Sequence, residues 1–410
     1  MRVAIFSHGH PKFNKGGAEI AAYSLFEAIN AVPGHDAWFI ARASSNMLHL
    51  GTPVAALSAR EYLIGGDADV LHLSSTIELG PKSDFARMLR SIDPDVIHFH
   101  HYVNLGVEMI HAARRMCPRA KIVVTLHEFI GICSNHGQMV KTNGELCYRA
   151  SPRECHNCFP HVTMENFFLR EDYVKSFFAK VDVFVSPSTF LKARYVAWGL
   201  PAEKIALIEN GIEEGKRLPP RFLPEGQNRS RFAYFGQINK FKGVDIILEA
   251  FVNLPKKARK QVSLDIYGSS LENQDQEFRD KVHGLLNLAD KRALGMIRYH
   301  GAYERAEMEN LMSEIDWVVM GSRWWENSPM VIQEAFKAGR PVICPNIGGM
   351  AEKVQPGRGG LNFLARDSVS LQNVVTSITE GAVDYDALVE QIPTYLSQAE
   401  CAQSHLQLYS

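Results

Sequence analysis

Residues 317–344 read WVVMGSRWWENSPMVIQEAFKAGRPVIC. The first four residues and the stretch Val342–Cys344 are short apolar runs, which are typical of strands buried on both faces of a sheet. Between them, Met330–Ala338 carries apolar residues at helical spacing. A strand, a helix and a second strand in this order form the repeating unit of a parallel sheet, so the stretch predicts an α/β fold.

The same alternation continues along the chain and occurs in two sets. A chain of 410 residues exceeds the roughly 250–300 residues that one core usually supports. Two sets of strands therefore predict two doubly wound, Rossmann-like domains. The expected strands are Val3–Phe6, Ala37–Ile40, Val70–Leu73, Val96–His98, Ile122–Leu126 and Val183–Val185, then Phe232–Phe235, Leu264–Tyr267, Ile297–Tyr299, Trp317–Met320, Val342–Cys344 and Asn362–Leu364.

We place the first domain at residues 1–205 and the second at 206–383, and we expect residues 384–410 to form a helix that returns to the first domain. A cysteine-rich loop spans 131–165 within the first domain. Ligands of open α/β sheets bind at the carboxyl ends of the strands. Two such sheets facing each other would form a cleft, with the chemistry in the loops that follow strands.

Composition excludes some functions. The formal net charge is −1, which argues against a general nucleic-acid binder. The apolar run after Met1 is too short for a signal peptide, and no stretch reaches the ~20 apolar residues that span a bilayer. We expect a cytoplasmic protein. The aromatic and basic stretch Asn166–Lys180 is either a helix that rests on the inner face of a membrane or a buried amphipathic helix.

Two loops of the first half could contact a ligand. Gly16-Gly17 opens a helix, and a helix N-terminus with glycines suits a phosphate; the alternative is an ordinary turn. His127 follows a strand and could hydrogen-bond a hydroxyl or move a proton. The alternative, for His127 as for His98, His100 and His101, is a structural histidine.

The second half offers a cationic loop and a pair of carboxylates. Lys240 and Lys242 follow the strand Phe232–Phe235 and form a candidate diphosphate site, or else a solvated basic loop. Further on, Asn327 or Ser328 can cap a helix that has Pro329 in its first turn, which sets Glu326 outside the helix and Glu334 inside it. Trp324 and Trp325 beside a carboxylate suit a sugar ring. Another glycine pair, Gly348-Gly349, is a candidate nest of backbone N–H groups.

Together these pieces resemble the retaining glycosyltransferase family four, whose members have the GT-B fold of two Rossmann-like domains facing across a cleft. The similarity covers most of the chain. It is carried by Gly16-Gly17, His127, Asn210-Gly211, Lys242-Gly243, the pair Glu326 and Glu334 with seven residues between them, and Gly348-Gly349 with Glu352.

The resemblance implies roles for these residues. Glu326, His127 and Lys242 are the expected catalytic residues. Lys242 neutralises the donor diphosphate, Glu334 holds the ribose hydroxyls and His127 contacts the transferred sugar. Family members usually have arginine where this chain has Gln237, and Lys240 is one candidate to replace it. The expected donor-binding residues are Gly16, Gly17, Gln237, Lys240, Lys242, Tyr267, Asn327, Ser328, Pro329, Met330, Val331 and Glu334.

The implied activity is transfer of a sugar, with retention of configuration, from a nucleotide-sugar donor to a saccharide or lipid-linked saccharide acceptor. Cell-surface polysaccharide or O-antigen (lipopolysaccharide) biosynthesis is the expected setting. No metal is needed for catalysis if cationic side chains stabilise the leaving diphosphate. A nucleotide-sugar epimerase of the same fold and a sugar-binding pseudoenzyme are the alternatives.

The cysteine-rich loop is a candidate metal site. Cys155 and Cys158 have the spacing of zinc ligands, and Cys133 and Cys147 could complete a tetrahedral structural site. Nearby histidines 136, 156 and 161 are competing ligands. The alternative is four free thiols, or a disulfide formed on isolation.

Overall fold

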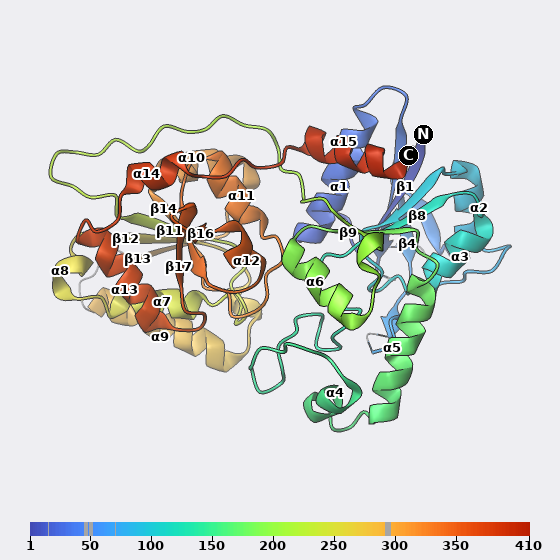
Figure 1. Ribbon diagram of the computed structural model, residues 1–410, viewed down its shortest axis with the longest axis horizontal. Helices are drawn as coiled ribbons and strands as arrows, with labels where there is room; N and C mark the ends of the chain where they lie inside the picture. The colour runs from blue at the N-terminus through green and yellow to red at the C-terminus, as the bar shows by residue number, and fades with distance from the viewer. Residues whose placement is uncertain (15, 45–47, 49–51, 70, 292–296) are drawn as a thin grey trace. The chain divides into compact units, whose positions relative to one another are not determined.

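The computed structural model describes residues 1–14, 16–44, 48, 52–69, 71–291 and 297–410. The chain divides into two compact units (Figure 1). One comprises Met1–Glu213 with Leu396–Ser410, and the other comprises Glu214–Tyr395. Each unit is built on a mainly parallel sheet, which confirms the predicted fold class. The roles assigned to the two domains stay predictions.

The described part of the first unit contains an eight-stranded sheet in the order β10-β9-β8-β7-β1-β2-β4-β3. Neighbouring strands are parallel, except that β3 runs antiparallel to β4. Its strands are β1 (Arg2–Ser7), β2 (Asp36–Ala43), β3 (Val54–Ala56), β4 (Glu61–Gly65), β7 (Val96–Phe99), β8 (Lys121–Thr125), β9 (Val183–Ser186) and β10 (Ile205–Leu207); β5 (Ala68–Asp69) and β6 (Ser74–Ser75) form a separate pair.

Helices cover both faces of this sheet. Val3 and Ile5 of β1 share a core with Leu25 of α1 and Leu406 of α15. Because side chains alternate along a strand, Phe6 points the other way, where its ring contacts Phe85 of α2. The helices are α1 (Gly17–Asn30), α2 (Asp84–Ile92), α3 (Glu108–Met116), α4 (Pro152–Cys158), α5 (Met164–Phe178), α6 (Thr189–Trp198), α15 (Gln398–Tyr409) and the 3₁₀ turn η2 (Ala202–Lys204).

The described part of the second unit contains a seven-stranded sheet in the order β13-β12-β11-β14-β15-β17-β16, with all neighbours parallel. Its strands are β11 (Arg231–Phe235), β12 (Ser263–Tyr267), β13 (Ile297–Gly301), β14 (Trp317–Val319), β15 (Val342–Pro345), β16 (Gln355–Pro356) and β17 (Gly359–Phe363). The unit is therefore an open parallel sheet, whose loops at the carboxyl ends of the strands can carry a site.

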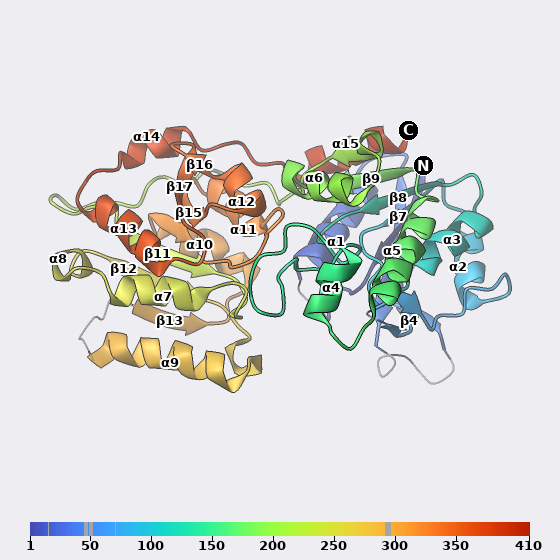
Figure 2. The ribbon, with the colours of Figure 1, turned by 60° about the horizontal axis from the view of Figure 1, so that its bottom comes forward.

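Helices cover the second sheet (Figure 2), and two hydrophobic cores lie between them and the strands. Residues of α7, α9, α13 and α14 pack on one face, and residues of α10, α11 and α12 pack on the other. The helices are α7 (Val244–Val252), α8 (Lys256–Arg259), α9 (Gln276–Lys291), α10 (Met308–Ser313), α11 (Met330–Lys337), α12 (Gly348–Lys353), α13 (Ser368–Thr379), α14 (Tyr385–Glu390) and the 3₁₀ turns η3 (Leu271–Asn273) and η4 (Arg305–Glu307).

One expected strand is wrong. Val70 lies outside the described residues, and residues 71–73 form a turn closed by a hydrogen bond from Leu73 N to Asp69 O. Leu73 has a left-handed backbone (φ 59°) that a strand does not allow. The side chain of Leu73 is buried, so this apolar residue packs in the core although its backbone pairs with no strand of the described residues.

The cysteine-rich segment gives no support to the predicted zinc site. Cys133, Cys147, Cys155 and Cys158 are not joined in disulfides. In the described residues, no group of three or more His, Cys, Asp or Glu side chains is arranged to hold a metal ion. Burial raises the pKa of Cys133 to about 11 and that of Cys155 to about 12, so both are protonated thiols at neutral pH.

The helices of the described residues include none that is both long and apolar enough to cross a membrane. On α5, the apolar side chains divide between two environments. Phe167 and Phe178 are buried, whereas Met164, Phe168 and Leu169 are exposed. The helix is therefore only partly a core element.

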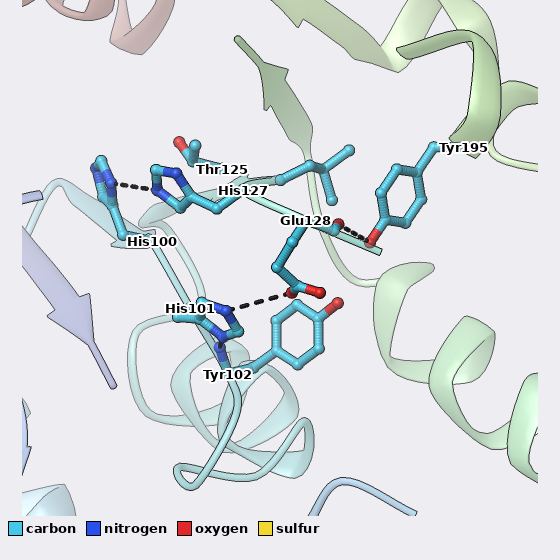
Figure 3. Close-up of a pocket in the computed structure, with 8 residues that line it drawn as sticks. His100, His101, Tyr102, Thr125, His127, Glu128 and Tyr195 are labelled. Atoms are coloured by element: carbon cyan, nitrogen blue, oxygen red, sulfur yellow. Dashed lines mark hydrogen bonds and ion pairs between the residues drawn. The ribbon is translucent and has the colours of Figure 1, made fainter. Parts of the chain in front are cut away.

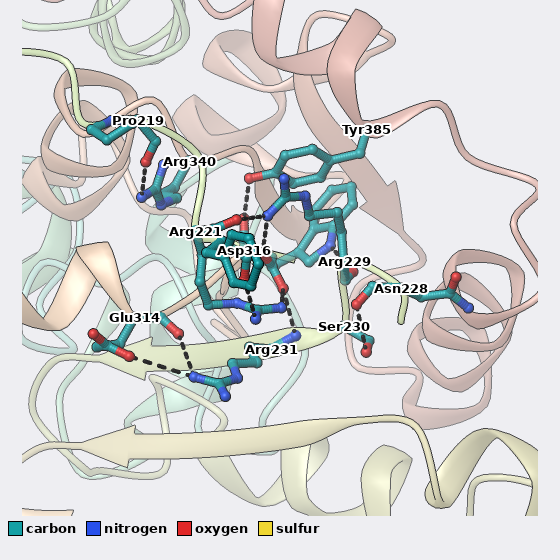
Figure 4. Close-up of polar contacts among 12 residues, drawn as sticks. Pro219, Arg221, Asn228, Arg229, Ser230, Arg231, Glu314, Asp316, Arg340 and Tyr385 are labelled. Carbon is teal, nitrogen blue, oxygen red and sulfur yellow. Dashed lines mark hydrogen bonds and ion pairs between the residues drawn. The ribbon is translucent and has the colours of Figure 1, made fainter. Parts of the chain in front are cut away.

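A buried carboxylate anchors the segment that enters the second unit (Figure 4). Asp316, just before β14, is fully buried. Its carboxylate accepts hydrogen bonds from Arg221 Nη2 at 3.0 Å, Arg229 Nη1 at 3.4 Å and the backbone N–H of Arg231 at 3.0 Å. Because a buried charge is stable only when it is paired and hydrogen-bonded, these contacts fix residues 221–231 at the start of β11.

We predict that Asp316→Ala lowers the free energy of unfolding of the second unit by about 3 kcal/mol, because it leaves two arginines beside an empty partner position. Denaturation in urea, followed by circular dichroism, measures the loss. Glu314→Ala is the matched control, since Glu314 pairs with Arg231 at 3.5 Å but is largely exposed. Equal losses in the two variants would contradict the anchoring role of Asp316.

Candidate functional site

In the second unit, Lys242 and Glu326 meet at the carboxyl end of the sheet. Lys242 lies in the loop after β11, and Glu326 lies in the loop between β14 and α11. Oε1 of Glu326 accepts hydrogen bonds from Lys242 Nζ at 2.5 Å, Ser322 Oγ at 2.8 Å and Trp324 Nε1 at 3.2 Å. The Glu326 residue is only 5% exposed. The structure thus brings together two of the three predicted catalytic residues.

Two glycines allow this approach. A Cβ atom on Gly243 would lie 2.0 Å from the carbonyl oxygen of Gly321, and one on Gly321 would lie 2.3 Å from the carbonyl oxygen of Gly243. Gly243 also has a left-handed backbone (φ 63°). Any side chain at either position would separate the two loops, and with them Lys242 and Glu326.

A second glycine pair, Gly348-Gly349, contacts the backbone of the loop that carries Glu326. The backbone N–H of Gly349 donates to the carbonyl of Glu326 at 2.6 Å. A Cβ atom on Gly349 would lie 1.7 Å from the carbonyl oxygen of Asn327. The N–H of Gly349, which we expected in a ligand-binding nest, therefore fixes the backbone of Glu326 and Asn327.

Helix α11 begins at Met330, with Pro329 as its N-cap residue and no side-chain cap. The predicted capping by Asn327 or Ser328 is therefore wrong, and both residues lie in the preceding loop. Met330 and Val331 form the first turn. Glu334 follows just over one turn into the helix, where burial raises the pKa of its carboxyl group. Arg305 Nη2 lies 3.8 Å from Glu334 Oε1.

Aromatic rings line the carboxyl ends of β11, β12 and β13. The ring of Tyr267 stacks on Phe235 with 5.1 Å between centroids, and on His300 with 4.5 Å. Tyr303 meets Phe235 edge-on at 5.6 Å. Burial, and then the neighbouring Glu334 carboxylate, raise the pKa of Tyr303. The aromatic rings and Glu334 therefore belong to one part of the surface.

Gln237 and Lys240 lie on the outer side of the loop after β11. Both are exposed. The carbonyl of Gln237 accepts a hydrogen bond from Tyr234 Oη at 2.7 Å. Lys240 Nζ lies 5.5 Å from the ring centre of Phe241, and across the described residues no carboxylate pairs with it. Lys240 is thus a cation available to an anionic ligand.

In the first unit, a small pocket opens where β7 and β8 end (Figure 3). His127 follows β8, and its Nε2 lies 3.1 Å from Nδ1 of His100. Oε1 of Glu128 lies 3.2 Å from Nε2 of His101. Tyr195 of α6 donates to the carbonyl of Glu128 at 2.9 Å. The lining residues are His100, His101, Tyr102, Thr125, Leu126, His127, Glu128 and Tyr195.

Burial keeps this pocket uncharged. Desolvation, with a smaller effect from His8, lowers the pKa of His127 to about 3. It also holds the pKa values of His100 and His101 well below their usual range, and it raises that of Glu128 well above. At neutral pH the imidazoles are therefore neutral hydrogen-bonding groups, and burial favours the protonated form of the Glu128 carboxyl group.

The predicted phosphate position at Gly16-Gly17 already holds a carboxylate. Glu19 of α1 is 2% exposed. A Cβ atom on Gly16 would lie 2.3 Å from its Oε2, whereas one on Gly17 would meet nothing within 4 Å. Gly16 therefore makes room for a side chain of the protein itself. Sequence reasoning missed Glu19, although a glutamate in the first turn after a glycine pair was a usable signal.

The predicted site residues fall into two sets. Among the predicted catalytic and donor-binding residues, Gly16, Gly17 and His127 lie in the first unit and the others lie in the second; the four cysteines of the predicted zinc site also lie in the first unit. Within the first unit, His8 and Glu128 join His127, and neither was predicted. Within the second unit, the loops after β11 and β14 and the start of α11 come together around Glu326.

Comparison with known proteins agrees with this geometry. A sequence model described as Glycosyltransferase Family 4 matches residues 15–216, and one described as Glycosyl transferases group 1 matches residues 220–393. A lipopolysaccharide 1,2-N-acetylglucosaminetransferase of Salmonella typhimurium is 29% identical over 49% of this chain and 53% of its own length. A glycogen synthase of Mycobacterium tuberculosis is 24% identical over 93% of this chain and 86% of its own length.

Solved structures share the fold. An Anabaena protein in complex with UDP and glucose has a TM-score of 0.63 at 17% identity, covering 100% of this chain and 99% of that one. A lipopolysaccharide outer core galactosyltransferase has a TM-score of 0.65 at 13% identity, with the same coverage. The two sequence models lie end to end over the two units. The chain belongs to glycosyltransferase family four, the group 1 glycosyl transferases of GT-B fold.

Proposed function

We propose that this protein transfers a sugar from a nucleotide-sugar donor to a saccharide acceptor, with retention of the anomeric configuration. The observation that carries the proposal is the convergence of Lys242, Ser322 and Trp324 on the Glu326 carboxylate. A cation, a carboxylate and an indole N–H at one point suit a sugar joined to a diphosphate. Glu334 and the aromatic rings at Tyr267 and Tyr303 lie in the same unit and suit a nucleoside.

In the proposed reaction, the bond between the anomeric carbon and the diphosphate oxygen breaks as the acceptor oxygen bonds to that carbon. Negative charge grows on the leaving diphosphate. Lys242 and Lys240 supply positive charge at that point, where it stabilises the transition state more than the ground state. Because Gln237 carries no charge, Lys240 takes on a larger share of this task.

The acceptor binds to the first unit, next to His127. A neutral imidazole both donates and accepts a hydrogen bond, which matches a sugar hydroxyl. A saccharide or lipid-linked saccharide of a cell-surface polysaccharide, lipopolysaccharide included, is the proposed acceptor. The Salmonella relative is named for such chemistry, and the exposed Met164, Phe168 and Leu169 on α5 suit contact with the inner face of a membrane.

The proposal is tested by a thermal-shift screen of UDP-glucose, UDP-galactose, UDP-N-acetylglucosamine and GDP-mannose, because a ligand that binds the native state raises the melting temperature. Turnover with the best donor follows, using maltooligosaccharide and lipopolysaccharide-core acceptors and NMR of the product. A new glycosidic bond with the donor's anomeric configuration supports the proposal. An epimerised nucleotide-sugar made without acceptor, or binding without turnover, would establish the epimerase or the pseudoenzyme instead.

We predict that Glu326→Gln lowers kcat about 100-fold, the usual cost of one preorganised electrostatic contact in an active site. Folding should change much less, because the amide oxygen still accepts hydrogen bonds from Ser322 and Trp324. Steady-state kinetics and thermal melting measure the two effects. If the variant loses its melting transition together with its activity, Glu326 has only a structural role.

Lys240→Ala should raise the donor KM about tenfold, the equivalent of about 1.4 kcal/mol. Lys256→Ala is the control, because Lys256 is an exposed lysine on α8 that we place outside the site. The difference should shrink as salt is added, since exposed charges are screened. Equal donor KM values for the two variants would remove Lys240 from the site.

Catalysis by cationic side chains predicts that activity survives EDTA. Transfer should proceed at an unchanged rate after dialysis against the chelator, because Lys240 and Lys242 provide the charge that a divalent cation would otherwise supply. The measurement is product formation before and after EDTA, with Mg²⁺ or Mn²⁺ added back. Complete loss that either ion restores would contradict this mechanism.

A further inference from the structure

The loop after β1 carries a histidine–carboxylate pair that the proposed mechanism does not use. His8 follows directly on the carboxyl end of β1, and its Nε2 lies 3.1 Å from Oε1 of Glu19. The same oxygen accepts a hydrogen bond from Asn14 Nδ2 at 2.8 Å. Glu19 is therefore held from two sides and, in turn, holds His8.

The glycines of this loop fit around Glu19. A Cβ atom on Gly9 would lie 3.1 Å from Glu19 Oε1, and one on Gly16 would lie 2.3 Å from Oε2. Burial alone would raise the pKa of Glu19, but its hydrogen bond with His8, with further contacts, outweighs burial and lowers the pKa. At neutral pH Glu19 is thus an ionised carboxylate, which can only accept hydrogen bonds.

An acceptor-only partner decides which nitrogen of His8 carries the proton. In the neutral form of His8, Nε2 donates to Glu19 and Nδ1 keeps a free lone pair. Nδ1 is shielded from solvent, and in the described part of the chain it makes no hydrogen bond. A buried polar atom without a partner costs free energy, so this nitrogen is a position for a ligand group that donates.

His8 lies next to His101, one of the residues that line the pocket. Its ring centre is 4.2 Å from that of His101, whose Nδ1 accepts the backbone N–H groups of Tyr102 and Val103. Nε2 of His101 lies 3.2 Å from Oε1 of Glu128. The charge state of His8 also influences the pKa of His127. Both ring nitrogens of His101 therefore have contacts within the protein, whereas Nδ1 of His8 makes no hydrogen bond among the described residues.

We propose that Nδ1 of His8 accepts a hydrogen bond from a sugar hydroxyl bound at the first unit, and that Glu19 is the positioning residue that fixes His8 in the required tautomer. This role rests on the proposed function, because it needs a sugar in the pocket. The hydroxyl belongs either to the acceptor or to the transferred sugar, since both offer the same chemistry. Glu19 itself does not touch the sugar.

The chain contains a matched control. His10 is a second histidine of this loop, and its Nε2 lies 2.8 Å from Oε2 of Glu61. Its Nδ1 already accepts the backbone N–H of Lys12 at 3.1 Å. His10 is also 4% exposed and packs between the rings of Tyr23 and Phe39. Its pair with Glu61 is therefore complete without a ligand.

The first test is NMR of the full chain labelled with ¹⁵N-histidine, without any sugar. The His8 signal, identified by its loss in His8→Asn, should show protonation at Nε2 only. Glu19→Gln should change it to a mixture of tautomers, because a glutamine amide can donate as well as accept. Glu61→Gln should leave His8 unchanged. Protonation of His8 at Nδ1 in the wild type, or no response to Glu19→Gln, would overturn the proposal.

The second test is kinetic and uses the donor and acceptor that the wild type turns over. His8→Ala should raise the KM of one sugar about tenfold, corresponding to one lost hydrogen bond. His8→Asn should restore part of the loss, because its side-chain oxygen can accept near the position of Nδ1. A rise in acceptor KM assigns the hydroxyl to the acceptor, and a rise in donor KM assigns it to the transferred sugar.

Unchanged KM values for both sugars in His8→Ala would overturn the sugar contact. Glu19→Gln should raise the same KM as His8→Ala, and the double variant should be no worse than His8→Ala alone, since the two act through one hydrogen bond. Failure of the proposed function looks different. In that case the wild type transfers no sugar, while the tautomer of His8 still follows Glu19.

Discussion

The candidate site of the second unit depends on a contact between two backbones. Gly243 and Gly321 place the loops after β11 and β14 so close that neither position has room for a Cβ atom. Because neighbouring parallel strands end at the same edge, the sheet brings these loops near each other, but only the glycines let them touch. The contact puts Lys242 against Glu326 before any ligand arrives. The cost of ordering these two side chains is met during folding, which is the physical meaning of a preorganised site.

Gly16 and Gly349, in the other glycine pairs, also allow a close approach, and in both cases the approaching atoms belong to the protein itself. Gly349 receives the backbone of Glu326 and Asn327, and Gly16 receives the carboxylate of Glu19. Glycine pairs at the ends of strands are commonly interpreted as phosphate cradles. In this protein, backbone atoms occupy the space beside Gly349 and the Glu19 side chain occupies the space beside Gly16. Their effect on a ligand is indirect, because they fix the residues that would touch it.

The fold was largely readable from the sequence, because buried parallel strands are continuous apolar runs. Phe232–Phe235 and Val342–Cys344 were placed within a residue or two of β11 and β15. The sequence misled at 71–73, where apolar residues form a turn, and it left β4 unpredicted. Candidate residues that belong to a contiguous motif, such as Glu326 and Glu334, could be named from the sequence, and their roles stay predictions. His8 and Glu19 were missed because their pairing depends on how the loop after β1 folds back onto α1, which residue spacing does not encode.

The two units handle charge in opposite ways. Around Glu326 the charged groups are paired, and the exposed Lys240 adds a cation with which no carboxylate of the described residues pairs. Around His127 burial disfavours charge, since it lowers the pKa of the imidazoles and raises that of Glu128, while the Glu19 carboxylate is held by His8 and Asn14. A departing diphosphate needs positive charge, whereas a sugar hydroxyl needs oriented neutral donors and acceptors. The distribution of charge therefore matches a division of labour in which the second unit receives the leaving group and the first unit orients a hydroxyl.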